Sequence, residues 1–342
     1  MRFKTLIHFG NSRWRRTQPR NSAQQLSSSA LRLGLRVLHL EPDCKAPGRL
    51  HCVSRFRLLS AREPEIVLRE FLPDWKVNPS DTLVMVSYAT PLSARLLDWF
   101  ARRGFATVFR LVDHFREDPE LGPFSAQAQH QLCQQAALVT LSHPGLRRLL
   151  GCRRPALELP NGLDVGHFGR SRDRRPKQMT LTFWGTFWGG RLDWPLLSGL
   201  ALRRPDWRFC MIGEGRYLPK GVVLPDNVHL LGPRHPAQLA DYGERSHVGL
   251  IPFRQDQDFA RYSNPIKALE YLSTGCPVLS PPNPSLENYP GVFFYSSLAE
   301  AEAQVLNASR FRLSARQVQE LRREHSWDRR FRQLLEEFGD ER

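Results

Sequence analysis

The sequence predicts an α/β protein with two Rossmann-like domains that face a cleft. Short apolar runs typical of strands alternate with helical stretches along the whole chain, as in parallel sheets with crossover helices. The pattern breaks once, at residues 166–177, where apolar periodicity is lost and charged residues gather. A chain of 342 residues is long enough to bury two ordinary cores. We therefore expect an N-terminal domain over residues 1–165, a linker over 166–177 and a second domain over 178–325.

Each expected element of the first domain is bounded by residues that favour its ends. Gly34 and Gly104 follow two helices at the position where a left-handed residue ends a helix, and Ser93 is a candidate N-cap. The expected strands are residues 5–9, 35–40, 82–87, 106–112, 138–142 and 156–159. The expected helices are residues 22–33, 93–103, 126–137 and 146–150.

The second domain repeats the alternation after the linker. We expect strands at residues 179–184, 207–212, 228–231, 248–252, 277–280 and 292–295. We expect helices at residues 194–204 and 236–245. A last helix starts near Trp327, because apolar residues follow it at helical spacing on one face.

Composition favours a globular, cytoplasmic protein without a metal centre. Hydrophobic residues make up 41% of the chain, which excludes the disordered class. No apolar run approaches the roughly 20 residues that span a bilayer, and the apolar stretch at the N-terminus is too short for a secretory signal. The six cysteines form no CxxC pair, and no histidine cluster has zinc spacing. We expect buried thiols, no metal and no cofactor.

The formal charge of +15 leaves several kinds of partner open. Arginine-rich runs occur at residues 13–16, 102–103, 147–148, 153–154 and 170–175. Nucleic acid, an anionic membrane surface and phosphorylated substrates all attract such a surface. The competing interpretation is a solvated arginine-rich surface without a ligand. No motif of a nucleic-acid reader is present, so we expect no nucleic-acid partner.

A short helix followed by a buried strand is predicted between residues 262 and 280. Asn264 is a candidate N-cap with Pro265 at the first helical position, where its missing N–H is tolerated. Gly275 stands where a left-handed residue ends the helix, and a proline follows two residues later. Residues that favour the ends of a helix therefore stand at both ends of the predicted helix.

This helix carries Lys267, Glu270 and Thr274 on one face, while apolar residues take the opposite face. A helix N-terminus favours anions through its free N–H groups and its dipole. Lys267 can neutralise a phosphate and Glu270 can accept hydrogen bonds from vicinal hydroxyls. A ligand with both groups is a nucleotide. The alternative is a solvated surface pair worth roughly 0.3 kcal/mol.

The motif Pro-x-Lys-x-x-Glu-Tyr-Leu-x-x-Gly-x-Pro-Val at residues 265–278 resembles the donor-site helix of nucleotide-sugar glycosyltransferases with the GT-B fold. Residues 138–142 and 157–168 resemble the close of the N-terminal domain in that family. Residues 325–331 resemble its C-terminal signature. The resemblance therefore covers nearly the whole chain and implies the two-domain GT-B architecture.

The resemblance also implies roles for single residues. The donor would be a UDP- or GDP-sugar, with Glu270 on the ribose and Lys267 near the diphosphate. Residues 326–342 would form a helix that returns to the N-terminal domain. Tyr262 stands where many members carry a second acidic residue, so the chain departs there from the fuller pattern.

Two loops and the start of the helix complete the expected donor site. The glycine-rich loop after the first strand of the second domain can present N–H groups to phosphate oxygens, and Arg191 can pair with Lys267 across the diphosphate. In related enzymes the position of Gly232-Pro233-Arg234 holds the base. The expected donor-binding residues are Gly185, Gly189, Gly190, Arg191, Arg234, Ser263, Asn264, Ile266, Lys267 and Glu270. The alternative for the glycine-rich loop is a geometric turn with Trp184 and Trp188 in the core.

Acceptor chemistry is expected at the end of the strand that closes with Asp113. A transferase that inverts configuration needs a general base, for which Asp113 is the first candidate and His114 the second. The Arg110-x-x-Asp113 pattern resembles bacterial exopolysaccharide glucuronosyltransferases of the xanthan type, in which that aspartate is the base. Alternatively Asp113 caps the next segment. The expected acceptor-binding residues are Arg15, Arg16 and Arg20, which could instead form a solvated basic loop.

The sequence thus predicts a glycosyltransferase. It would move a sugar from a nucleotide-diphosphate sugar to a hydroxyl of a lipid-linked saccharide or polysaccharide intermediate of exopolysaccharide synthesis. It would work in the cytoplasm, in peripheral contact with the anionic inner face of the membrane. Two alternatives stay open: a nucleotide-sugar 2-epimerase on the same fold, and a non-catalytic basic protein that binds nucleic acid.

Overall fold

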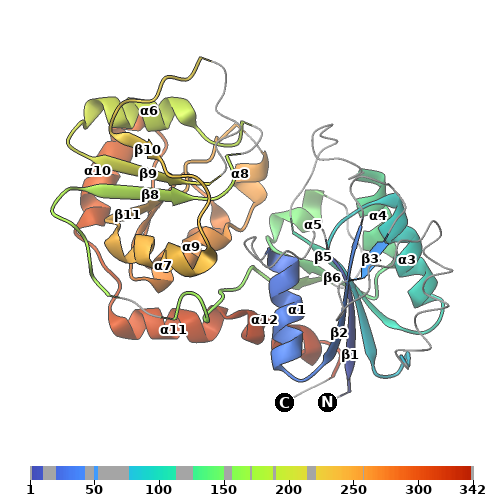
Figure 1. The fold of residues 1–342 in the computed structure, drawn as a ribbon. Helices are drawn as coiled ribbons and strands as arrows, with labels where there is room; N and C mark the ends of the chain where they lie inside the picture. Colours follow the sequence, from blue (N-terminus) through green and yellow to red (C-terminus); the bar gives the residue numbers. More distant parts are fainter. Residues whose placement is uncertain are drawn as a thin grey trace. The chain divides into compact units, whose positions relative to one another are not determined.

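The chain divides into two compact units (Figure 1), Met1–Asn161 with Trp327–Arg342, and Gly162–Ser326. The computed structural model describes residues 2–10, 21–42, 50–52, 77–112, 126–149, 156–169, 172–187, 190–213, 221–256 and 258–339. The helices described in this way include none with the length and apolarity to cross a bilayer.

The first unit is built on a seven-stranded sheet with the order β3-β2-β1-β4-β5-β6-β7. Its strands are β1 (Thr5–Phe9), β2 (Arg36–Pro42), β3 (Leu50–Cys52), β4 (Thr82–Val86), β5 (Ala106–Leu111), β6 (Leu138–Leu141) and β7 (Ala156–Glu158). In the part of the chain before the second unit, its helices are α1 (Ser22–Arg32), α3 (Pro91–Ala101), α4 (Ala126–Gln135) and α5 (Gly145–Leu149). Strand β3 pairs antiparallel with β2, and the other neighbours pair parallel.

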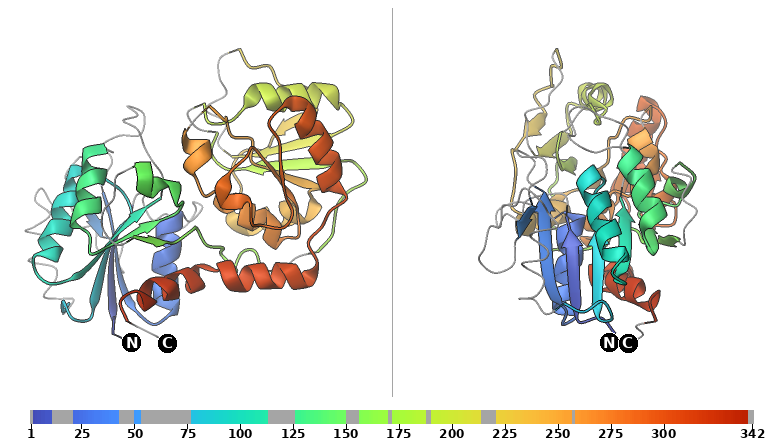
Figure 2. Two further views of the ribbon diagram at one scale, coloured as in Figure 1. Left: turned by 180° about the vertical axis from the view of Figure 1, so that it is seen from behind. Right: turned by 90° about the vertical axis from the view of Figure 1, so that its right-hand side faces the viewer.

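Helices cover both faces of this sheet, with α1 on one face and α3 and α4 on the other (Figures 1 and 2). Strands β1 and β4 pair in register and are buried along their whole length. A parallel strand that is covered on both faces needs apolar side chains at successive positions, which explains the unbroken apolar runs of the sequence.

The last helix, α12 (Trp327–Glu336), belongs to the first unit and packs on α1. Its Asp328 Oδ1 accepts hydrogen bonds from Ser29 Oγ at 2.5 Å and from Arg32 Nη2 at 2.6 Å. Phe331 on the same helix is fully buried. The predicted return of the C-terminal helix to the N-terminal fold is confirmed.

The second unit contains six parallel strands in the order β10-β9-β8-β11-β12-β13. The strands are β8 (Thr180–Trp184), β9 (Arg208–Ile212), β10 (Val228–Leu230), β11 (Val248–Leu250), β12 (Val278–Ser280) and β13 (Val292–Phe294). The helices are α6 (Trp194–Arg203), α7 (Pro236–Arg245), α8 (Asp258–Tyr262), α9 (Ile266–Ser273), α10 (Leu298–Ser309) and α11 (Ala315–His325), with a 3₁₀ turn at Pro284–Leu286. Figure 1 shows α6 and α10 on one face of the sheet and α7 and α9 on the other. The predicted α/β class with two Rossmann-like folds is confirmed.

Several elements differ from the sequence prediction, among them the start of α3 and four elements that were not expected, β3, α8, α10 and α11. Helix α3 begins at Pro91, capped by Thr90, and Ser93 is the third helical residue of a reciprocal capping box and not the N-cap. Helices α10 and α11 were not expected, because only a few of their residues meet the core. In α11 the buried residues are Val318 and Leu321, which is too sparse a pattern for periodicity to reveal.

A buried polar chain ties the centre of the first sheet to α1. His8 Nδ1 lies 2.8 Å from Ser27 Oγ, and His8 Nε2 lies 2.7 Å from Ser87 Oγ. Ser27 Oγ also lies 2.7 Å from Nδ1 of His39. Burial, with smaller effects of His39 and Arg110, holds the pKa of His8 well below its usual value of 6.5. His8 is therefore neutral in the folded protein at neutral pH.

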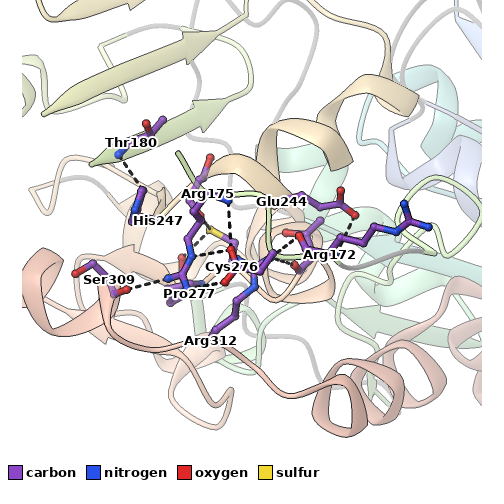
Figure 3. A network of polar contacts seen from close by, with 12 residues as sticks. Arg172, Arg175, Thr180, Glu244, His247, Cys276, Pro277, Ser309 and Arg312 are labelled. Atoms are coloured by element: carbon purple, nitrogen blue, oxygen red, sulfur yellow. Dashed lines mark hydrogen bonds and ion pairs between the residues drawn. The ribbon is translucent and has the colours of Figure 1, made fainter. Parts of the chain in front are cut away.

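At the amino edge of the second sheet, arginines fasten residues 172–177 to the unit (Figure 3). The backbone N–H of Arg172 donates to Glu244 Oε1 at 3.1 Å, and Arg175 Nη1 donates to the carbonyl of Ser309 at 2.9 Å. Arg312 Nη2 donates to the carbonyls of Arg172 and Thr274, each at 2.9 Å. Within the basic run at residues 170–175, the backbone of Arg172 and the side chain of Arg175 thus make contacts inside the second unit.

Cys276 lies in the same network, fully buried, with its Sγ 3.7 Å from the carbonyl of Ser246. Burial raises the pKa of this thiol to about 12, so it stays protonated and unreactive. Cys133 and Cys210 are also free and buried. For these three cysteines the predicted role in packing is confirmed.

The pKa of His8 predicts an acid-sensitive first unit. Below pH 6.5 the unfolded chain takes up a proton that folded His8 resists, so stability is full above pH 6.5 and falls as the pH drops, by at most about 1.4 kcal/mol per pH unit. Urea unfolding at pH 7.5 and 5.5 measures this slope. We expect His8→Gln to flatten it, and an unchanged slope in that variant would contradict the assignment.

The contacts of Arg312 predict that removal of this one partly buried side chain lowers the stability of the protein. Arg312→Ala removes the donor from the partly buried carbonyl of Thr274 and from the exposed carbonyl of Arg172, so we expect a loss of about 2 kcal/mol in the free energy of unfolding. The matched control is Arg316→Ala, since the side chain of Arg316 is 88% exposed and pairs with Glu320 one turn along α11. Chemical denaturation of both variants measures the difference. Equal effects would show that the contacts of Arg312 contribute little.

Candidate functional site

The second unit has one topological switch point, between β8 and β11. From β8 the chain moves outward to β9 and β10, and from β11 it moves the other way to β12 and β13. Ligands of open α/β sheets bind at the carboxyl ends of the strands at such a point. The residues that follow these two strands, Gly185 and Ile251–Phe253, are therefore where a site is expected.

Helix α9 begins one residue later than the sequence predicts. Pro265 is the N-cap, with φ −71° and ψ 110°, and no side chain caps this end. The predicted N-cap Asn264 is instead buried, and so is Ser263, whose carbonyl accepts a hydrogen bond from Asn283 Nδ2 at 3.1 Å. These two predicted donor residues lie in the segment that leads into the helix. Ile266 is its first helical residue and is partly exposed.

The other end of α9 is neutralised by two guanidinium groups. Arg312 Nη2 donates to the carbonyl of Thr274 at 2.9 Å, and Arg322 Nη2 donates to that of Ser273 at 2.6 Å. Gly275 follows with φ +82°, as predicted. Cations stabilise the C-terminal end of the helix dipole, while the N-terminal end has no side-chain cap and favours an anion.

Thr274 does not join the predicted polar face of Lys267 and Glu270. It is fully buried, its Oγ1 donates to the carbonyl of Tyr271 at 2.7 Å, and its side chain packs against Gly243. The helical period is interrupted here because the last turn tightens toward Gly275. The polar face of α9 is therefore restricted to its first two turns.

Lys267 lies directly over the switch point. Its Nζ is 4.9 Å from the ring centroid of Phe253 and 5.4 Å from that of Phe183. A Cβ on Gly185 would lie 3.5 Å from the same nitrogen. Aromatic faces attract a cation and hold it in place, so the ammonium group is positioned at the end of β8 next to bare backbone.

Glu270 lies one turn further along α9 and is partly buried. Its Oε2 accepts a hydrogen bond from Trp184 Nε1 at 2.7 Å. Burial raises the pKa of Glu270, while the hydrogen bond from Trp184 and the charge of Lys267 oppose the rise. The site thus holds a cation and a hydrogen-bond acceptor side by side, which suits a ligand with both phosphate and hydroxyl groups.

Glycines bring the ends of three strands close together beside these side chains. Gly185 N donates to the carbonyl of Ile212 at 2.9 Å, and Gly213 N donates to that of Gly232 at 3.1 Å. Their φ angles are +145° for Gly185, +156° for Gly213 and +68° for Gly232, which favour glycine. A Cβ on Gly213 would lie 1.8 Å from the carbonyl oxygen of Gly185. The glycines of this edge are therefore required by its geometry.

The structure places two further predicted donor residues near this centre. Gly190 has φ +67°, and the carbonyl of Arg191 accepts a hydrogen bond from Arg254 N at 2.9 Å. The next residue, Leu192, forms a β-bridge with Phe253, the ring that contacts Lys267. The described end of the predicted glycine-rich loop thus leads into a strand contact beside the lysine, while the pairing of Arg191 with Lys267 stays a prediction.

Arg234 lies in the turn after β10, where its Nε donates to Tyr242 Oη at 3.3 Å and its Nη1 donates to the carbonyl of Pro233 at 3.1 Å. Its predicted contact with a base stays a prediction. Six other predicted site residues lie outside the described residues: Gly189, Asp113, His114, Arg15, Arg16 and Arg20.

Sequence reasoning missed two contributors to the site. Trp184 was considered only as a core residue, although its indole N–H is bonded to Glu270. His167 Nδ1 lies 2.7 Å from Asp164 Oδ2, and the charge of Asp164 raises the pKa of Glu270. Their signal was present in the segment 157–168, which the sequence identifies only as the close of a domain.

The second half of the chain is similar to a family of known proteins. Residues 174–336 match the model of the family described as glycosyl transferase-like. This part of the chain is therefore similar to that glycosyltransferase family. The matched region includes β8, the switch point and α9.

One relative is the protein of Bacillus subtilis (strain 168) that carries the name teichuronic acid biosynthesis glycosyltransferase TuaH. The two sequences are 25% identical over 183 residues, which are 49% of this chain and 46% of TuaH. The chain therefore spans about half the length of the curated relative that it matches.

Two solved structures match nearly the whole chain. The sucrose-phosphate synthase of Thermosynechococcus elongatus has a TM-score of 0.66 at 14% identity and covers 98% of both chains. Anabaena HepE, solved in complex with UDP, has a TM-score of 0.63 at 12% identity and covers 98% of this chain and 100% of its own. The predicted GT-B fold and the predicted resemblance to glycosyltransferases are confirmed.

The close backbone approach at Gly213 predicts an unusually costly glycine substitution. Gly213→Ala would place a methyl group against the carbonyl of Gly185, so we expect the free energy of unfolding to fall by about 3 kcal/mol. Gly221→Ala is the control, because Gly221 has φ +85° with nothing within 4 Å of the added Cβ, and should cost about 1 kcal/mol. Chemical denaturation compares the two. Equal costs would mean that backbone strain alone matters.

Proposed function

We propose that the protein transfers a sugar from a nucleotide-diphosphate sugar to a hydroxyl group of an acceptor. The observation that carries this proposal is the pairing of Lys267 and Glu270 on α9, beside glycine backbone at the switch point. The match of residues 174–336 to a glycosyltransferase family supports it. UDP in the structure of HepE supports a nucleotide-sugar donor.

On this proposal the first turns of α9 hold the leaving nucleotide. Lys267 and the uncapped N-terminus of the helix stabilise the diphosphate as negative charge develops on it. Glu270 accepts hydrogen bonds from the ribose hydroxyls. Arg191 and the glycine-rich loop complete the diphosphate site, and the turn at Gly232 and Arg234 holds the base. UDP and GDP both remain candidates for the nucleotide.

The proposed acceptor is a lipid-linked saccharide or a polysaccharide intermediate of cell-surface polymer synthesis. The name of TuaH, which refers to teichuronic acid biosynthesis, supports this class. Asp113 would remove the acceptor proton, with His114 as the second candidate, and Arg15, Arg16 and Arg20 would bind acceptor phosphate.

We also propose that the protein works in the cytoplasm in peripheral contact with the anionic inner face of the membrane. The formal charge of +15 supports this contact, since each basic residue near anionic lipid contributes about 1 kcal/mol. Arg102 and Arg103 after α3, and Arg147 and Arg148 on α5, are exposed basic pairs of the first unit.

Nucleotide binding tests the donor assignment. We expect Lys267→Ala and Glu270→Ala each to weaken binding at least about 10-fold in isothermal titrations with UDP, GDP and dTDP, because each removes a charged contact. Glu320→Ala, on the exposed face of α11, is the control and should bind like the wild type. Unchanged affinity in the Glu270 variant would remove the ribose assignment.

Turnover tests the acceptor assignment separately. We expect Asp113→Asn to keep wild-type affinity for the donor and to lower kcat by about 100-fold or more, as loss of a general base does. The assay supplies a UDP- or GDP-sugar with a lipid-diphosphate saccharide. Full turnover in this variant would exclude Asp113 as the base. Epimerised sugar from donor alone would favour the nucleotide-sugar epimerase instead.

A further inference from the structure

We infer that Trp184 is a positioning residue for donor recognition, which fixes the carboxylate of Glu270 against the ribose of the nucleotide. The inference rests on the proposed function, because it takes a nucleotide as the ligand of Glu270. It adds a residue that the family motif of α9 does not contain, since Trp184 comes from the end of β8.

The hydrogen bond between the two side chains is short and one-directional. Trp184 Nε1 lies 2.7 Å from Glu270 Oε2. An indole N–H is only a donor and a carboxylate is only an acceptor, so neither group can exchange roles with a neighbour. A charge-assisted bond of this kind fixes the rotation of the carboxylate. Glu270 then presents its remaining lone pairs to a ligand in one orientation.

The indole itself is held on both sides. Its ring lies 3.7 Å from the Tyr271 ring centroid and stacks on Phe168 at 6.3 Å with an interplanar angle of 24°. Trp184 N donates to Tyr271 Oη at 3.1 Å, and Tyr271 Oη donates to the carbonyl of Thr182 at 2.8 Å. Because Trp184 is only 4% exposed, its N–H has few other orientations available.

Gly249 on β11 makes room for this arrangement. A Cβ at Gly249 would lie 2.3 Å from the Tyr271 ring. Tyr271 can therefore lie flat against the sheet, where it supports the indole. The sequence of supports runs from Gly249 through Tyr271 and Trp184 to the carboxylate of Glu270. Packing alone would require an apolar ring at position 184 but no N–H group directed at the site.

Four neighbouring groups act on the charge of Glu270. Burial raises its pKa most, and the hydrogen bond from Trp184 opposes this more than any other group. Lys267 on the same helix lowers the pKa, Asp164 raises it and His167 lowers it, the last two from the segment before β8. Removal of the indole N–H leaves burial and Asp164 less opposed. Glu270 then takes up a proton at higher pH, and a protonated carboxyl accepts ribose hydrogen bonds less well.

The test combines a variant that removes the N–H with a matched control. Trp184→Phe removes the donor, and Trp207→Phe removes an equally buried indole from the residue before β9. The register of β8 with β9 pairs Trp184 with Ile212 and Thr180 with Arg208. Trp207, which is buried, therefore lies at the amino ends of these strands, whereas Trp184 lies at their carboxyl ends. Both variants lose the same atoms, and urea unfolding measures their stability.

The first readout is the affinity for UDP, 2′-deoxy-UDP and 3′-deoxy-UDP at pH 7.5. We expect Trp184→Phe to weaken UDP binding about 10-fold. Removal of a ribose hydroxyl from UDP should lower the affinity of this variant less than it lowers that of the wild type. The double variant with Glu270→Ala should bind UDP no more weakly than Glu270→Ala alone. Trp207→Phe should bind like the wild type. A loss in Trp184→Phe that equals that of Trp207→Phe, or that adds fully to Glu270→Ala, would overturn the inference.

The second readout is the pH dependence of binding, which a purely structural role would not move. UDP-glucose is the probe, because its diphosphate is doubly esterified and has no proton to lose between pH 5 and 8. We expect its affinity to fall in acid at a higher pH for Trp184→Phe than for the wild type and Trp207→Phe. Coincident profiles would contradict the positioning role.

Two further outcomes keep the test decisive. If Trp184→Phe fails to fold, 3-benzothienylalanine at position 184 restores the ring shape without an N–H and repeats both readouts. If Glu270→Ala binds UDP like the wild type, the proposed function fails at the donor site, independently of Trp184. If Glu270→Ala weakens binding and Trp184→Phe does not, only the positioning role fails.

Discussion

The hydrogen bonds of Tyr271 to strand β8 decide where the functional face of α9 lies. Tyr271 Oη accepts from the N–H of Trp184 and donates to the carbonyl of Thr182, so the buried side of the helix is fixed to the central strand of the sheet. Lys267 lies one turn before Tyr271 on the same face of the helix, and Glu270 is the residue next to Tyr271. Their position relative to the glycines after β8 therefore follows from one buried tyrosine and from the space that Gly249 leaves for it.

Much of this fold could be predicted because its signals are local. Strand β1 and helix α7 have the predicted bounds, and Gly34, Gly104 and Gly275 end helices with positive φ as expected. Local rules also locate Lys267 and Glu270 on one face. They fail at the start of α9, where Pro265 replaces Asn264 as the N-cap because tertiary packing buries the asparagine. A propensity for capping cannot predict which polar residue the core will cover.

The parts of the site that could not be predicted depend on contacts between distant residues. Trp184 and Glu270 are separated by 86 residues, and Lys267 meets Phe183 and Phe253 because β8 and β11 end side by side. A tryptophan at the end of an apolar strand looks like core in any sequence, and here it is also core. Its second role is visible only when the acceptor of its N–H is known. The acceptor-side predictions at Asp113 and Arg15 depend on chain segments beyond the described residues.

The positive charges have different roles at the amino ends and at the carboxyl ends of the strands of the second sheet. At the amino ends of the strands, arginines 174, 175, 312 and 322 meet carboxylates and carbonyls of the same unit, so their charge is used within the fold. At the carboxyl edge, Lys267 lies against aromatic faces next to an uncapped helix N-terminus. Helix α9 runs from the carboxyl ends to the amino ends of the strands. Cations stabilise the C-terminal end of its dipole, and its N-terminal end, which has no side-chain cap, lies at the switch point. A net charge read from composition therefore overstates how much of it faces a partner.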